Sequence, residues 1–148
     1  MSEEERRFEE RLENWGRWLR EGKHAGVSNL WPILQRLPKA KDQEAAIGVA
    51  SDLPNALDEA DALKVQRAWS QLPRTSLQDQ EARTLIGAVY AYQGCDMGRI
   101  LFHVRQVHYA GSHTPIRIRR GDIEPLLERA RKMMRNVLNR LDNAEGAC

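Results

Sequence analysis

Apolar residues recur in this chain at intervals of three and four positions, and this spacing constrains the fold more than any other feature. The pattern is clearest near the end, where Ile123, Leu127, Ala130 and Met134 form a stripe that leaves the charged residues between them on the other side. An α-helix has 3.6 residues per turn, so such a stripe lies on one helix face and packs on a neighbour. The sequence therefore predicts an all-α fold.

Five segments are predicted to be helical, joined by turns that contain glycine or proline. Pro73 is predicted to end the second helix and Gly94 to cap the third. Asn55 and Asp122 are predicted to cap the starts of the second and the last helix, because their short polar side chains accept hydrogen bonds from the first turn. The predicted helices are residues 3–21, 55–72, 79–92, 96–107 and 122–141.

Two regions are distinguished along the chain. Residues 1–53 comprise the first helix and a connecting segment, of which residues 23–53 have the weakest pattern. Residues 54–148 carry the remaining helices, and we expect the two regions to form one compact unit. Residues 116–120 alternate apolar and cationic side chains, which predicts a short extended basic arm before the last helix.

Positive charge is concentrated in one part of the chain, although the formal net charge of the whole is only +2. Residues 99–140 contain ten lysines and arginines against three acids, whereas residues 1–98 contain 13 against 16. Nine of the ten cations are arginines, whose planar guanidinium suits bidentate contacts to phosphate and guanine. Local positive surface binds phosphate backbones, so this part predicts an anionic partner. A solvated charged face is the alternative.

Motifs of enzymes and cofactor sites are missing from the sequence. There is no phosphate-binding loop, dinucleotide glycine fingerprint, nucleophile elbow or zinc-protease motif. Cys95 and Cys148 match no metal-ligand spacing, and His103 and His108 are five positions apart and do not share a helix face. The acids of residues 58–61 are interpreted as compensating a helix dipole. We expect neither an enzyme nor a cofactor, metal or small-molecule substrate.

No stretch is long and apolar enough to span a bilayer, and no apolar segment follows the charged N-terminus as in a secretory signal. A cytosolic protein without a membrane partner is therefore expected.

A short helix, an irregular connection and a long helix flanked by arginines are typical of a helix-turn-helix, like that of sigma factor region 4. In that motif the second helix enters the major groove with its first turns against the bases. We expect arginines before the last helix to contact phosphates, and outward residues of its first turns to lie near base edges. The predicted DNA-binding residues are Arg117, Arg119, Arg120, Glu124, Glu128, Arg131, Lys132 and Arg135.

Three blocks of the chain resemble the late-gene antitermination Q proteins of lambdoid phages, of the phage-21 type. The first is Leu12-Glu13-Asn14-Trp15-Gly16-Arg17-Trp18. The second is Asp58-x-x-Asp61-Ala62 opening one helix, with Tyr90-x-x-x-Gly94 ending the next. The third is Ile123-x3-Leu127-x2-Ala130-x2-Met133-Met134-x2-Val137-Leu138. The blocks span residues 12 to 138. The connection between His108 and Asp122 is longer than in a lean helix-turn-helix.

The resemblance implies a protein of the host bacterial cytoplasm that binds double-stranded DNA near a phage late promoter. It implies that the protein engages a paused, sigma-containing RNA polymerase, travels with it past terminators and lies close to nascent RNA. The four tryptophans, Trp15, Trp18, Trp31 and Trp69, are candidates for a polymerase-facing surface, although Trp15 and Trp69 lie on predicted core stripes.

Two other functions are compatible with the sequence. A conventional helix-turn-helix repressor or activator would use the same DNA-binding residues without travelling with polymerase. A helical protein-interaction module, such as an inhibitor of a host protein, would instead present the basic face to an acidic partner.

Overall fold

The computed structural model describes residues 2–21 and 57–146, which contain five α-helices, one 3-10 turn and no strand. The all-α prediction is therefore confirmed for this part of the chain. The connecting segment 23–53, including Trp31, lies outside the described residues. The elements are α1 (Glu3–Arg20), α4 (Glu59–Ser70), α5 (Leu77–Ala91), α6 (Met97–Val104), η1 (Arg120–Asp122) and α7 (Ile123–Gly146).

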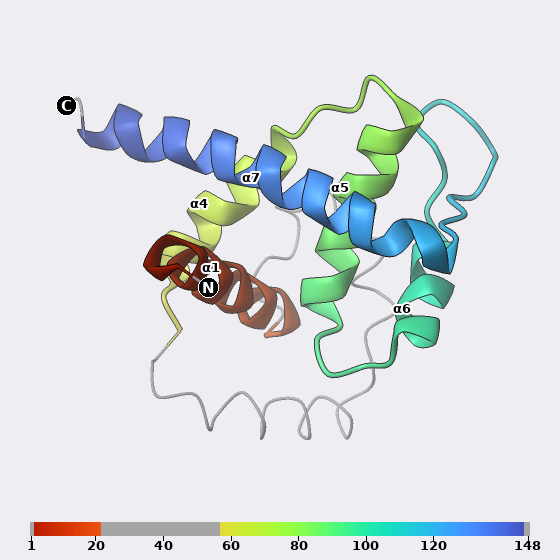
Figure 1. Ribbon diagram of the computed structural model, residues 1–148, viewed down its shortest axis with the longest axis horizontal. Coiled ribbons are helices and arrows are strands. Elements are labelled where there is room, and N and C mark those ends of the chain that lie inside the picture. Colours follow the sequence, from red (N-terminus) through yellow and green to blue (C-terminus); the bar gives the residue numbers. More distant parts are fainter. Residues whose placement is uncertain (1, 22–56, 147–148) are drawn as a thin grey trace.

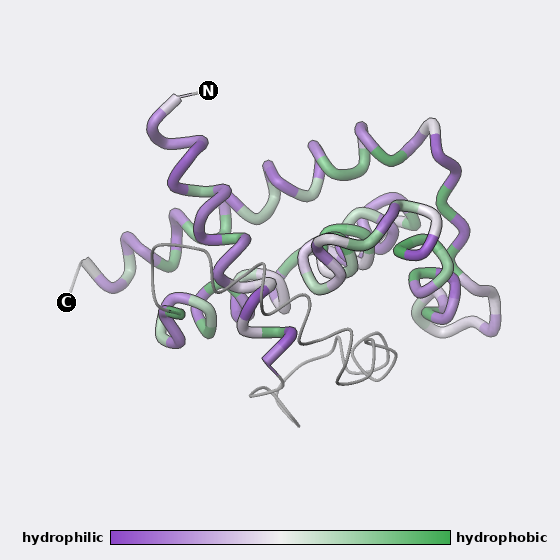
Figure 2. The backbone as a smooth tube through the Cα atoms, turned by 90° about the horizontal axis from the view of Figure 1, so that it is seen from below, coloured by the Kyte–Doolittle hydropathy of each residue, from purple (hydrophilic) through white to green (hydrophobic). Residues whose placement is uncertain are grey.

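Four of these helices surround a common core. The long α7 crosses α4 and α5, α1 packs against the same two helices, and α6 lies beside α5 at the end of the molecule opposite α1 (Figure 1). Hydrophilic and hydrophobic residues alternate turn by turn along α1 and α7 (Figure 2), as in amphipathic helices. None of the described helices is both long and apolar enough to cross a membrane.

Three aromatic side chains form the centre of the core. The ring centroid of Trp15 lies 6.4 Å from that of Trp69 and 6.5 Å from that of Tyr90, in tilted arrangements. Both buried indoles satisfy their N–H groups: Trp15 donates to Gln66 Oε1 and Trp69 donates to the carbonyl of Arg83, each at 2.9 Å. Trp15, Trp18 and Trp69 are at most 3% exposed, as the predicted core stripes indicated for Trp15 and Trp69, so none of the three belongs to a polymerase-facing surface.

Gly16 is the point of closest approach between α1 and α5. A Cβ added to this glycine would lie 2.4 Å from the carbonyl oxygen of Tyr90, so any side chain would push the two helices apart. Arg20 donates a hydrogen bond of 2.8 Å to the same oxygen. Close packing of α1 against α5 therefore explains the glycine in the Trp15-Gly16-Arg17-Trp18 block.

Capping residues explain where most helices begin, and they correct two predictions. Asp58, not Asn55, caps α4: its carboxylate accepts from the N–H of Asp61 at 3.0 Å, and Asn55 lies outside the described residues. Asp122 does not cap the last helix, because it lies inside η1 and donates its N–H to the carbonyl of Arg119. α7 also continues to Gly146, beyond the predicted end at residue 141.

The predicted stripe of the last helix is buried as expected. Ile123, Leu127, Ala130 and Met134 are all at most 7% exposed, and Ala130 is fully covered. The opposite face of α7, which carries the charged residues, is therefore turned toward solvent.

Candidate nucleic-acid interface

A basic groove lies between α6 and the segment that leads into α7. It has a volume of about 780 Å³. Its apolar floor includes Leu101 and Ile118, and four arginines provide its charge. The lining residues are Gly98, Leu101, Arg105, Arg117, Ile118, Arg119 and Arg120. We refer to this feature as the arginine groove.

One wall of the groove is formed by a segment in which buried isoleucines alternate with exposed arginines. Ile116 and Ile118 are 1% and 3% exposed, whereas Arg117 and Arg119 between and after them are exposed. Successive side chains of an extended backbone point to opposite sides, so anchoring the isoleucines in the core turns the arginines outward. The predicted extended segment 116–120 is found only in part: Arg119 has extended backbone, Arg120 already lies in η1, and the buried isoleucines hold the segment against the core.

A hairpin-like loop precedes this wall. The N–H of Ile116 donates to the carbonyl of Val107 at 2.8 Å, and that of Tyr109 donates to Thr114 at 3.0 Å. Gly111, with φ of +76°, provides the left-handed conformation at the turn. The N–H of Ala110 donates to the Gln80 side chain at 2.8 Å, which ties the loop to α5. Residues 105–119 therefore separate α6 from η1, in place of a turn of three or four residues.

A glycine allows Arg120 to approach the first turn of α6. The position of a Cβ on Gly98 would lie 3.4 Å from a guanidinium nitrogen of Arg120 and 3.2 Å from a carboxylate oxygen of Asp96. Since Gly98 has no side chain, the Arg120 guanidinium lies against the helix backbone and remains at the groove.

The groove arginines have no acidic partner among the described residues, unlike several other arginines. Elsewhere, Arg11 pairs with Asp61 and Asp142 at 3.0 Å, and Arg129 pairs with Asp79 at 2.9 Å. Within residues 2–21 and 57–146, no acid lies within ion-pair distance of Arg105, Arg117, Arg119 or Arg120. Four unneutralised guanidinium groups around one groove create a local positive potential that attracts anions.

The predicted site residues separate into three sets. Arg117, Arg119 and Arg120 meet at the arginine groove. Glu124, Glu128 and Lys132 are exposed at successive turns of α7. Arg131 and Arg135 point elsewhere.

Arg131 is engaged within the protein. It donates to the phenol oxygen of Tyr90 at 3.0 Å and lies 3.8 Å from Glu9, so its predicted place among the residues nearest to the bases is not supported by its geometry. Burial lowers the pKa of Arg131, but the interactions with Tyr90 and Glu9 outweigh it and raise that pKa overall. The guanidinium is therefore a structural cation.

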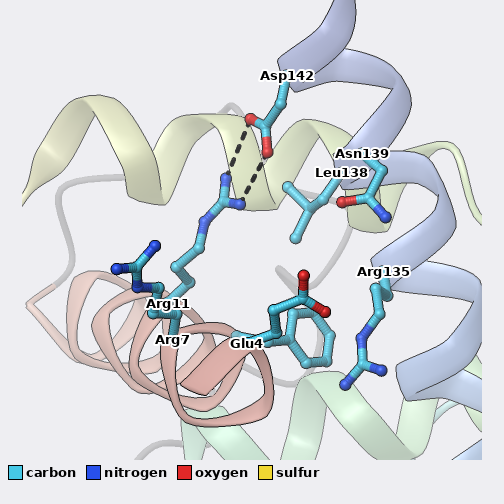
Figure 3. Close-up of a pocket in the computed structure, with 8 residues that line it drawn as sticks. Glu4, Arg7, Arg11, Arg135, Leu138, Asn139 and Asp142 are labelled. Carbon is cyan, nitrogen blue, oxygen red and sulfur yellow. Dashed lines mark hydrogen bonds and ion pairs between the residues drawn. The ribbon is translucent and has the colours of Figure 1, made fainter. Parts of the chain in front are cut away.

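Arg135 lines a second, smaller groove between α1 and α7. Its guanidinium carbon lies 4.9 Å from the centroid of the Phe8 ring. This groove, of about 310 Å³, also contains Glu4 and the Arg11–Asp142 pair that spans it (Figure 3). Because acids line it beside the arginines, it is far less suited to a polyanion than the arginine groove.

Sequence reasoning missed four of the residues that line the groove: Gly98, Leu101, Arg105 and Ile118. The predicted helix 96–107 includes Arg105, but α6 ends at Val104 and leaves Arg105 at its C-cap. Only the return of the chain through the hairpin-like loop brings Arg105 and Gly98 beside Arg117 and Arg120, and no local pattern signals that return.

Comparisons with known proteins add no relative. The chain matches no protein-family model, no curated protein and no solved structure. The arginine groove and the residues beside it are therefore the features that indicate a function.

Proposed function

We propose that this chain is a transcription antitermination factor that binds DNA through the arginine groove and acts on bacterial RNA polymerase. The observation that carries the proposal is the set of four arginines, Arg105, Arg117, Arg119 and Arg120, which line one groove without acidic partners. The resemblance of the three sequence blocks to the Q proteins supports the more specific part, which is action on polymerase at a late promoter.

The chemistry of the groove suits a phosphate backbone. A guanidinium can donate two parallel hydrogen bonds to phosphate oxygens, and such charge-assisted bonds are stronger than neutral ones. The arginines contact consecutive phosphates and fix the register of the duplex, while Glu124 and Glu128 accept hydrogen bonds from base edges, as acids do from the amino group of cytosine.

The proposed reader is a modified helix-turn-helix of the sigma region 4 type. In this arrangement α6 is the first helix and α7 is the recognition helix, with the hairpin-like loop inserted in place of a short turn. The supporting features are the burial of Ile123 and Leu127 against the rest of the protein and the exposure of Glu124 and Glu128 in the first turns of α7.

Contact with polymerase would use the opposite end of the molecule. The first half of α1 carries four exposed acids against two exposed arginines, Arg6 and Arg7, and α1 lies away from α6 (Figure 1). An acidic surface there leaves the basic end free for DNA, so one protein can bind both partners. Acidic and basic ends of this kind also favour a fixed orientation between DNA and enzyme.

A transcription assay with purified bacterial RNA polymerase tests the proposal. The template carries a phage late promoter followed by a terminator. The readout is the fraction of transcripts that extend past the terminator. The wild type is expected to increase that fraction. The double variant R119A/R120A is expected to lose the effect, because it lacks two phosphate contacts. R67A/R74A removes two exposed arginines elsewhere and is expected to behave as the wild type.

Other results identify the alternatives. Specific duplex binding without read-through would indicate a conventional regulator and contradict the polymerase part of the proposal. Absence of duplex binding at low salt would contradict the DNA part as well, and would favour a protein-interaction module.

A further inference from the structure

The outer face of α6 carries an aromatic side chain that the protein core does not use. Phe102 is 57% exposed. Among the described aromatic residues it is the only exposed one, since the others are buried or, like Tyr109, half-buried. Exposing a phenylalanine costs hydrophobic stabilisation, so a single exposed aromatic beside a basic groove raises the question of what covers it.

Cations flank this ring on the same helix face. Arg99 lies three positions before Phe102 and Arg105 three positions after it, and residues at this spacing are neighbours on a helix surface, about 5–6 Å apart at their Cβ atoms. Both arginines are exposed. Arg105 also lines the arginine groove, so Phe102 is the helix-surface neighbour of a groove residue.

Buried rings hold Phe102 in place from behind. His103 contacts the Phe102 ring edge-on, with centroids 5.5 Å apart, and itself stacks parallel on Tyr92 at 4.4 Å. His103 and Tyr92 are 7% and 1% exposed. One side of Phe102 is thus fixed by the core, while the rest of the ring faces solvent.

We infer that Phe102 is a stacking platform for an unpaired nucleobase, whose flanking phosphates are held by Arg99 and Arg105. An aromatic face between cations is the arrangement by which proteins bind single strands, because every base offers a flat surface for stacking and the backbone offers charge. A duplex hides its bases from such a contact. The inference rests on the proposed function and adds a preference: the arginine groove holds duplex backbone, and Phe102 selects an unpaired base next to it.

Fluorescence anisotropy tests this with three labelled probes: a 12-nucleotide oligothymidine, a 12-nucleotide oligouridine and a mixed-sequence DNA duplex. F102A is expected to bind at least one single strand about tenfold more weakly than the wild type, since stacking on one aromatic is worth roughly five- to 150-fold. Its duplex affinity is expected to change less than about twofold. F102W is expected to restore single-strand binding. The oligothymidine and oligouridine arms distinguish DNA from RNA as the source of the base.

A control variant tests whether removal of any exposed apolar side chain weakens binding. Leu77 is 59% exposed on α5, and L77A is expected to leave all three affinities unchanged. Unfolding temperature, measured for each variant, shows that the fold is intact.

Three results would overturn the inference. They are unchanged single-strand binding by F102A, an equal loss on duplex and single strands, and absence of single-strand binding by the wild type. Different results would contradict the proposed function. They are absence of duplex binding by the wild type, or a duplex affinity of R119A/R120A equal to that of the wild type.

Discussion

The guanidinium of Arg131 donates a hydrogen bond of 3.0 Å to the phenol oxygen of Tyr90. This bond joins α7 to α5, and the phenol in turn donates to Glu9 on α1 at 2.9 Å. Arg131 therefore stabilises the packing of three helices. We expect R131A to lower the free energy of unfolding by about 1.5 kcal/mol, the lower end for a hydrogen bond made by a charged group because Arg131 is partly exposed, and to leave duplex affinity within about twofold.

Urea denaturation and duplex anisotropy, measured on the same samples, check this expectation. Lys132 is the matched control, because it is the next cation on α7 and is exposed, without an ion pair among the described residues. K132A is expected to leave stability unchanged. A loss of duplex affinity in R131A as large as in R119A would restore Arg131 to the DNA-binding set.

Tyr90 also gives the protein a specific sensitivity to alkaline pH. Burial raises the pKa of Tyr90 to about 12, and the neighbouring Glu9 carboxylate acts in the same direction against Arg131. The folded state then keeps the phenol proton between pH 10 and 12, where the unfolded state has lost it. Stability is therefore full below about pH 10 and falls as the pH rises through 12.

The variant Y90F isolates this effect. It lacks the titrating group, so its free energy of unfolding is expected to fall less between pH 9 and 11.5 than that of the wild type, by roughly 2 kcal/mol. The measurement is urea denaturation at both pH values, with tyrosine ionisation followed by absorbance. Parallel pH profiles for the two proteins would contradict the assignment.

Close packing at Gly16 predicts a strongly destabilised variant. A Cβ there would lie 2.4 Å from the Tyr90 carbonyl oxygen, which is backbone and cannot move without shifting α5. We expect G16A to lower the free energy of unfolding by about 2 kcal/mol or more, as overpacked cores do. G121A is the control, because nothing lies within 4 Å of its Cβ position. Comparable stability of the two variants in thermal unfolding would show that α1 and α5 separate at little cost.

Local patterns predicted the helical framework well. The stripe from Ile123 to Met134 follows from helical periodicity alone, because burial of one face requires no knowledge of the partner helix. Cap positions are less certain for a physical reason: Asn55 and Asp58 are both good N-cap residues, and only the folded backbone selects Asp58.

The site was harder to predict, because its chemistry depends on distant partners. Arg119 and Arg131 look alike in the sequence, yet one lines a groove and the other bonds to a tyrosine 41 positions away. Tertiary contacts decide whether an arginine has an acidic partner. The density of cations along the sequence therefore indicates the basic end of the protein, but it does not identify the arginines that have no such partner.

Acid should weaken a clamp between α1, α4 and α7. Burial raises the pKa of Asp142, but hydrogen bonds from Arg11 and Lys64 outweigh it and lower that pKa below its ordinary value. A lowered pKa stabilises the fold above the ordinary value and loses that contribution as the pH falls through the folded value. D142N is expected to be less stable at pH 7 and to lose less stability than the wild type between pH 6 and pH 3.

Urea midpoints at several pH values test the clamp. Glu3 pairs with Arg6 on the surface of its own helix, so E3Q serves as control and is expected to follow the wild-type profile. If D142N and the wild type lose stability equally in acid, the ion pairs of Asp142 do not hold the three helices together.

The central claim, that the arginine groove binds a phosphate backbone, is tested most directly by the salt dependence of duplex binding. Each neutralised phosphate contributes about 0.9 to the slope of log affinity against log salt concentration. Anisotropy titrations between about 50 and 200 mM salt are expected to give R119A/R120A a slope that is shallower than wild type by roughly 1.8. The control R67A/R74A is expected to keep the wild-type slope. Equal slopes for all three proteins, or the same change in both variants, would contradict the assignment of the groove.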